Sequence, residues 1–224
     1  TPGGLPAIEE SIFNGVPVNV TLLFTAGQSR AAAEAYLRGI ERRIEAGRDP
    51  VVGSVASLFI SRWDKASAAQ LPEELHNTLG IAIAQRAYRE YRELLASPRW
   101  QRLAAAGALP QRLLWASTGT KDPKASDILY IRALAAPDTI NTMPEKTLHA
   151  FASEGAVNGV MPEDGGDSEA VLAEFSASGI DTGALAGQLQ AEGAQSFTKS
   201  WNDLMEVIAS KSEQLHGSDG PPKK

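Results

Sequence analysis

The chain has 224 residues, of which 43% are hydrophobic and 21% charged, with a formal net charge of −6. This composition is ordinary for a globular domain, and the acidic balance argues against nucleic acid as a partner. The absence of cysteine excludes a disulfide framework, a thiolate metal site and a cysteine nucleophile, and it suits a cytoplasmic protein. No apolar run reaches the roughly 18–20 residues that cross a bilayer, so we expect no membrane partner.

The first strong pattern is an alternation of apolar and other residues over positions 16–22. One side carries Val16, Val18, Val20 and Leu22, and the other carries Pro17, Asn19 and Thr21. This period of two predicts a β-strand whose second face presents an amide and a hydroxyl. A helical pattern over 29–46 follows directly. A strand with polar groups at its carboxyl end, followed by a helix, is the unit from which α/β active sites are built.

Strands and helices continue to alternate along the chain. We expect strands at 51–60, 112–116 and 138–142, and helices at 7–14, 73–95, 100–106 and 144–152. Such alternation predicts a parallel sheet covered by helices. Four strands are half of the eight in a (β/α)8 barrel, and four strands alone would leave two unpaired edges.

The pattern changes after residue 152. A loop rich in Gly, Asp and Pro precedes helices expected near 169–177, 182–191 and 194–211. Ser168 and Asp181 stand where N-caps would be. The sequence therefore predicts half of a barrel with a helical C-terminal extension.

Polar and basic residues follow the second strand at its carboxyl end. Ser57, Phe59 and Ser61 share one face, and Arg62 comes next. A guanidinium at that place can bind a phosphate group through two hydrogen bonds. The alternative interpretation is a surface salt bridge, which contributes little to stability.

The third strand ends in a loop whose glycine lies between hydroxyl residues and is followed by Lys121. This arrangement is typical of an anion-binding loop, although it lacks the Walker spacing and could equally be a polar turn. Asn19 and Thr21 likewise could be satisfied polar residues of a barrel interior. The three histidines have no metal-ligand spacing, and no pair of carboxylates suits acid–base chemistry.

Four segments, in this order, closely resemble the transaldolases: residues 15–24, 54–62, 114–121 and 137–144. The form of the third segment resembles the bacterial and plant branch, which includes fusions to a glucose-6-phosphate isomerase domain. Gly193 and Trp201 in the helical end belong to stretches that resemble that branch too. The resemblance implies the C-terminal half of a TIM barrel in residues 1–152 and a helical extension of the same domain in 153–216. The composition of residues 217–224 predicts a disordered tail.

The resemblance also implies a reaction. Transaldolases transfer a dihydroxyacetone unit, from sedoheptulose 7-phosphate to glyceraldehyde 3-phosphate, giving erythrose 4-phosphate and fructose 6-phosphate in the pentose phosphate pathway. A lysine holds the unit as a Schiff base, which accepts the electron pair of the broken carbon–carbon bond. The partners are then sugar phosphates, and no cofactor or metal is implied.

Residue roles carry over by motif. Asn19 would hydrogen-bond the dihydroxyacetone unit, and Thr21 would place the water that relays protons. Ser57 and Arg62 would hold the sugar phosphate, and Phe59 would shape the pocket. Lys121 occupies roughly the place of a phosphate-binding arginine in other branches.

The family's Schiff-base lysine is expected four residues before Thr1, because Thr1 matches the threonine of a Lys-x-x-x-Thr motif. The first lysine of this sequence is Lys65, so we expect this chain alone to be inactive and to need a missing N-terminal half of the barrel as its partner. Two alternatives stay open: a catalytically inactive sugar-phosphate-binding half-barrel, and a small aldolase that cleaves fructose 6-phosphate.

Overall fold

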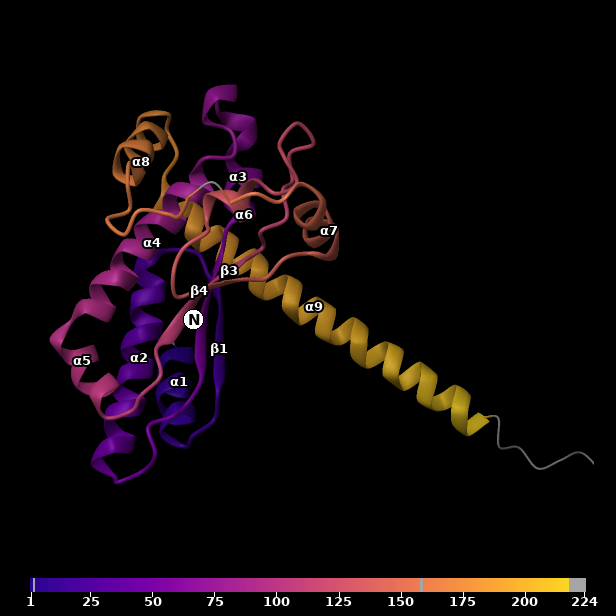
Figure 1. Cartoon of the computed structure of the whole chain (residues 1–224). Helices are drawn as coiled ribbons and strands as arrows, with labels where there is room; N and C mark the ends of the chain where they lie inside the picture. Colours follow the sequence, from indigo (N-terminus) through magenta and orange to yellow (C-terminus); the bar gives the residue numbers. More distant parts are fainter. Residues whose placement is uncertain (2, 158, 218–224) are drawn as a thin grey trace, which may run out of the picture.

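One parallel sheet organises the chain. The structure, a computed structural model, describes residues 1, 3–157 and 159–217. Within them the strands lie in the order β1-β2-β3-β4, and every neighbouring pair is parallel. The strands are β1 (Val18–Leu23), β2 (Ser54–Phe59), β3 (Gln111–Ala116) and β4 (Thr139–Asn141). The predicted α/β class with four parallel strands is confirmed (Figure 1).

Helices connect the strands and continue past the last one. They are α1 (Gly4–Phe13), α2 (Ala26–Glu45), α3 (Ser61–Ser67), α4 (Leu79–Ala96), α5 (Pro98–Ala105), α6 (Leu129–Ala133), α7 (Glu145–Glu154), α8 (Ser168–Ala177) and α9 (Thr182–Gly217). Two short 3-10 turns, η1 (Ala68–Gln70) and η2 (Glu73–Leu75), separate α3 from α4. The α7 helix crosses the predicted boundary at residue 152, and α8 packs against α4.

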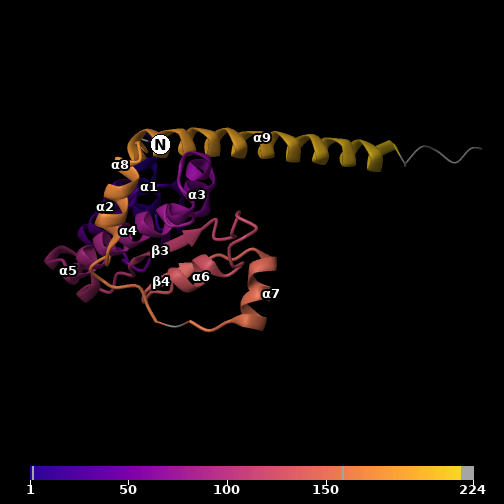
Figure 2. The same ribbon diagram turned by 90° about the horizontal axis from the view of Figure 1, so that it is seen from above.

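One face of the sheet is covered by helices. In Figures 1 and 2, α2 and α4 lie on the same side of the strands, and both contact the sheet. The strand residues facing them are apolar and buried, among them Val20, Ala56 and Leu113. The opposite face contains Asn19 and Thr21, which are exposed. The core therefore lies between the sheet and α1, α2 and α4, and the second face is partly open.

The first strand departs from the predicted alternation at its end. The register with β2 shifts between Val20 and Leu23, and Leu22 has a φ of +60°. Consequently Leu23, not Leu22, follows Val20 into the core. Val16 lies before the strand and is exposed. The predicted range 16–22 was therefore wrong at both ends, because a backbone kink is invisible to a simple period of two.

The helix predicted at 73–95 is also wrong at its start. Pro72 leads only into the η2 turn, and Asn77, with a φ of +62°, separates that turn from α4. The helices α3 and α6 were not predicted, since each is too short to show a clear period.

The C-terminal helices expected at 182–191 and 194–211 form one continuous helix, α9. Gly193 does not interrupt it, because a helix tolerates a single glycine at a cost of about 1 kcal/mol. The Asp181 cap is confirmed, since its Oδ1 accepts from the N–H groups of Gly183 and Ala184, both at 2.9 Å. Ser168 is the first residue of α8 and not its cap.

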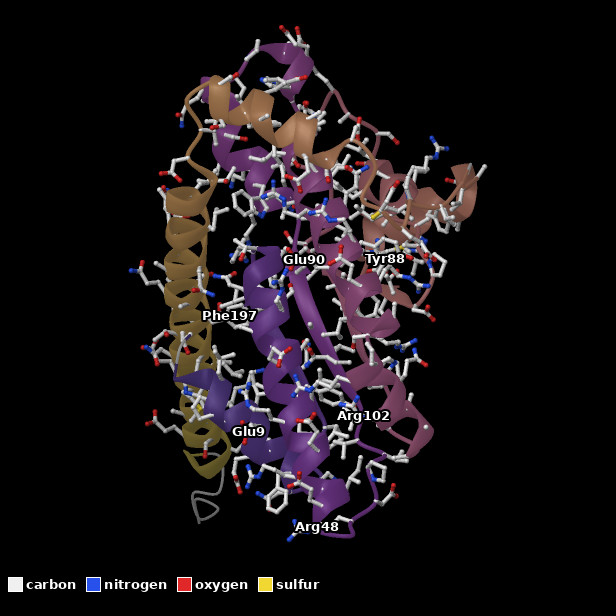
Figure 3. All side chains as sticks on the ribbon, turned by 90° about the vertical axis from the view of Figure 1, so that its left-hand side faces the viewer. Glu9, Arg48, Tyr88, Glu90, Arg102 and Phe197 are labelled. Atoms are coloured by element: carbon white, nitrogen blue, oxygen red, sulfur yellow. The ribbon has the colours of Figure 1, made fainter. Side chains whose placement is uncertain are left out.

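The two halves of α9 have different surroundings. Its first turns pack on the body of the molecule, whereas the rest runs clear of it (Figure 1). Phe197, which Figure 3 labels on this second part, is 52% exposed, and Trp201 is 62% exposed. No helix in the described ranges has both the length and the apolar character needed to cross a bilayer. Of the predicted tail, residues 218–224 lie outside the described residues.

Candidate active site

Strand register brings most of the predicted site residues to one face of the sheet. Asn19 pairs with Val55, and Ser57 lies two residues further along β2 on the same face. Thr21 and Phe59 follow on that face because side chains repeat every second residue along a strand. This face points away from α2 and α4. The predicted grouping of an amide, two hydroxyls and an aromatic ring is therefore present in the fold.

A hydrogen bond links the first two strands at this face. The Ser57 hydroxyl donates to Oδ1 of Asn19 over 2.7 Å, and Ser57 is buried while Asn19 is exposed. This bond fixes the orientation of the Asn19 amide, whose nitrogen carries two N–H donors. Asn19 is thus pre-oriented as a hydrogen-bond donor on an open surface.

Arg62 lies just beyond β2, in the first turn of α3. Its guanidinium carbon is 4.9 Å from the centroid of the Phe59 ring, a cation–π contact that orients the group. Within the described residues Arg62 takes part in no salt bridge, whereas many of the other arginines pair with carboxylates on the helices. A half-buried guanidinium that is stacked but not neutralised is suited to receive an anion.

The ends of β2 and β3 are joined by hydroxyl groups. The hydroxyls of Ser61 and Ser117 lie 3.0 Å apart, and Ser117 has a φ of +56°. Thr118 is fully buried and donates to Oδ1 of Asn141 over 2.8 Å. These residues fix the start of the loop after β3, so the loop is structured by internal bonds at its first positions.

Lys121 lies apart from that group. It is exposed and lines a hollow of about 390 Å³ together with Lys65, His76, Asn77 and Lys124. None of the other predicted site residues lines this hollow. The lining of this hollow also includes the carboxyl groups of Asp64 and Asp122, and the predicted phosphate contact of Lys121 is the least supported of the set.

A buried carboxyl that sequence reasoning missed anchors α3. Asp64 accepts a 2.6 Å hydrogen bond from the Tyr130 hydroxyl and one of 3.2 Å from the Gly80 N–H. Burial raises the pKa of Asp64 to about 6, against the lowering effect of these bonds. The residue ties α3 to α4 and α6 and so holds the helix that carries Arg62. In the sequence, the only indication that this side chain is buried is its position between Trp63 and an amphipathic stretch.

In the described part of the chain, no group of three or more His, Asp or Glu side chains is placed to hold a metal ion. A hollow of about 590 Å³ on the open face includes Asn19 and Arg112 at the amino ends of the strands. It does not include Ser57, Phe59 or Arg62, which lie toward the carboxyl ends.

Known proteins match this chain over almost all of its length. The family model for transaldolase/fructose-6-phosphate aldolase matches residues 1–208. The chain is 46% identical to a transaldolase of Frankia alni, an alignment covering 98% of this chain and 62% of the relative. It is 45% identical to a transaldolase of Parafrankia sp. strain EAN1pec, over 93% and 59%. A transaldolase of Neisseria meningitidis serogroup A is 39% identical, over 92% and 59%.

The chain thus spans between 59% and 62% of the length of these relatives. The family model covers the four described strands, the loop after β3 and α9 as far as residue 208. The chain belongs to the transaldolase/fructose-6-phosphate aldolase family.

Proposed function

We propose that this chain supplies the substrate-binding half of a transaldolase that acts on sugar phosphates. The observation that carries the proposal is the pairing of Ser57 with Asn19 beside an Arg62 that is stacked on Phe59 and forms no salt bridge within the described residues. A hydrogen-bond donor for a ketose thereby lies on the open face of β1, and a cation for its phosphate lies just beyond the carboxyl end of β2, the end at which (β/α)8 enzymes bind substrates.

The sheet would be four of the eight strands of a TIM barrel. Both β1 and β4 are edge strands, and open edges in a folded protein are normally paired or covered. The relatives are long enough to supply further strands. The open face bearing Asn19 and Thr21 would then point into the barrel.

The nucleophile would come from outside the described strands. None of the four strands contains a lysine, so the Schiff-base lysine is proposed to lie upstream of Thr1. Its amine adds to the ketose carbonyl and water leaves, forming an iminium. The C3–C4 bond then breaks, the C4 hydroxyl loses its proton, and the electron pair moves into the iminium to give an enamine. The enamine attacks an aldose phosphate, and water releases the product.

This chain's residues would bind and orient. The Asn19 amide donates to a hydroxyl of the dihydroxyacetone unit, and Thr21 holds a water in the proton relay. Arg62 binds the phosphate. Ser57 orients Asn19 through its hydrogen bond, and the Phe59 ring orients Arg62. The contact of Lys121 with phosphate stays a prediction.

Trapping with borohydride tests the proposal. Protein that includes the segment before Thr1 should form a stable adduct with fructose 6-phosphate, detected by intact mass, and should transfer the unit to erythrose 4-phosphate. The 224-residue chain alone should form none. An adduct on the chain alone would place the nucleophile within it. Adduct formation with cleavage but without transfer would favour the small-aldolase alternative.

A second candidate is a non-catalytic sugar-phosphate-binding half-barrel. It is favoured by one observation, that the sheet presents binding groups but no lysine. Binding of fructose 6-phosphate without any adduct, even with the upstream segment present, would support it.

A further inference from the structure

The first half of α9 lies against the site from a distant part of the sequence. Figures 1 and 2 show α9 passing α3 before it runs clear of the body, and both α3 and β1 contact it. The buried positions of this half are Ala186, Leu189 and Gly193, a spacing of three and four that defines one helix face. This face meets the carboxyl end of β1 and the first turn of α3.

Gln190 holds the kink of β1 in place. Its Nε2 donates to the Leu22 carbonyl over 3.1 Å. Leu22 is the residue with a φ of +60° at the register shift, and such a conformation in a residue with a branched side chain costs energy. Because Leu22 follows Thr21 directly, the bond also fixes the end of the strand that carries Asn19 and Thr21.

Gly193 is the point of closest approach. A Cβ at this position would lie 2.8 Å from Cδ2 of Leu22 and 3.2 Å from Nη1 of Arg62. Both distances are shorter than ordinary van der Waals contact. The two atoms are ends of flexible side chains, so those side chains would move before the helix backbone does. Any side chain at 193 would therefore displace the guanidinium.

We infer that Gly193 and Gln190 are positioning residues for Arg62, and that α9 forms a wall which keeps this guanidinium stacked on Phe59. The absence of a side chain at 193 gives Arg62 its room, and the Gln190 bond sets the distance of the helix from β1. The role of Arg62 in binding phosphate rests on the proposed function, whereas its placement by α9 does not.

The test compares two glycines of the same helix. Gly193→Ala introduces the crowding methyl, and Gly187→Ala is the matched control, because a Cβ at 187 meets nothing within 4 Å. The readout is the Nε–Hε NMR signal of Arg62, which the Phe59 ring current shifts. We expect the signal to move in Gly193→Ala and to stay in Gly187→Ala. An unchanged signal in folded Gly193→Ala overturns the inference.

A compensating variant separates crowding from misfolding. In Leu22→Ala/Gly193→Ala, the leucine atom that the methyl would meet at 2.8 Å is gone, so the clash with β1 is relieved, whereas the 3.2 Å approach to Nη1 of Arg62 remains and the Arg62 signal should stay displaced. If Gly193→Ala alone does not fold, this double variant carries the test. An Arg62 signal at its original position in the folded double variant also contradicts the inference.

Enzyme kinetics on protein that includes the upstream segment give the second readout. Gly193→Ala should lower kcat/KM for fructose 6-phosphate about tenfold relative to its value for unphosphorylated fructose, mainly through KM. Gly187→Ala should leave that ratio unchanged. A displaced Arg62 signal with an unchanged ratio would leave the positioning intact and refute the phosphate-binding role of Arg62, so the two proposals fail in distinguishable ways.

Discussion

The two halves of α9 share one helix and one kind of residue pattern but differ in what surrounds them. In the first half, Leu189 is 4% exposed and packs on the body. In the second half, Leu204 is 50% exposed, on the part that Figure 1 shows running clear of the rest. Phe197, Trp201, Leu204 and Ile208 continue an apolar stripe along it. Periodicity thus predicts a helix and its apolar face, but not whether that face is covered.

The two halves of α9 therefore have different roles in the structure. The first half donates a hydrogen bond to the Leu22 carbonyl and lies close to Arg62 at Gly193. In the second half, Lys199 pairs with Asp203 one turn further along the same helix. Stability and site geometry should therefore respond to changes in the first half and hardly at all to matched changes in the second.

The largest expected contrast is between two leucines of α9. Leu189→Ala should destabilise the chain by about 3 kcal/mol, because it removes a buried side chain and leaves a cavity. Leu204→Ala should change stability by less than about 0.5 kcal/mol, as is usual for exposed positions. Urea unfolding followed by tryptophan fluorescence measures both. An equal loss of stability in the two variants would mean that the second half is packed in solution. The two halves of α9 would then not differ in their surroundings.

The pH dependence of stability tests the part of the molecule on which the first half of α9 packs. This half contacts α3, and Asp64 anchors α3. The pKa of Asp64 is about 6 in the folded chain because of burial and ~3.9 when unfolded. Between these values the folded state binds more protons, so the contribution of Asp64 to stability falls as pH rises, by on the order of 3 kcal/mol. Above pH 6 it is constant.

The measurement is the difference in unfolding free energy between wild type and Asp64→Asn, followed from pH 3.5 to 7. This difference should decline with rising pH. Asp122→Asn is the control of opposite sign, because a hydrogen bond from the Lys124 N–H lowers the pKa of that exposed carboxyl. A flat difference for Asp64→Asn would show that its pKa is not raised.

The smallest contrast is between two glutamines. Gln190→Ala should cost about 1 kcal/mol, since it leaves the Leu22 carbonyl without this donor. Gln188 donates only to Glu192 on the exposed face of the same helix, over 2.8 Å, so Gln188→Ala should cost about 0.3 kcal/mol. Hydrogen exchange at the end of β1 should quicken only in Gln190→Ala. Quickening in both variants would argue against a specific role for Gln190.

Much of the fold was accessible from the sequence. The four strands appear within a few residues of their predicted places, and the period of two put Asn19 and Thr21 on the face opposite Val20. The kink at Leu22 was not accessible, because it depends on a glutamine 168 residues away. The break at Asn77 and the short helix α3 were missed since they lack a period.

For the site, motifs indicated which residues to examine, and the sheet register brought Asn19 to Ser57. Sequence order placed Lys121 beside a strand end, but the loop carries it to a hollow with Lys65 and His76. Asp64 escaped notice because a carboxyl shows no sign of burial until the elements around it are packed.

The sequence by itself determined the class of the fold and the alternating faces of the strands, because these depend on neighbours along the chain. Only the tertiary structure decided that the two predicted C-terminal helices are one, that its first half closes on Arg62, and that its second half stays exposed. The continuity of the helix reflects its tolerance of Gly193. The other two outcomes depend on whether α9 contacts residues more than a hundred positions away, such as Leu22 and Arg62, and local periodicity carries no information about such contacts.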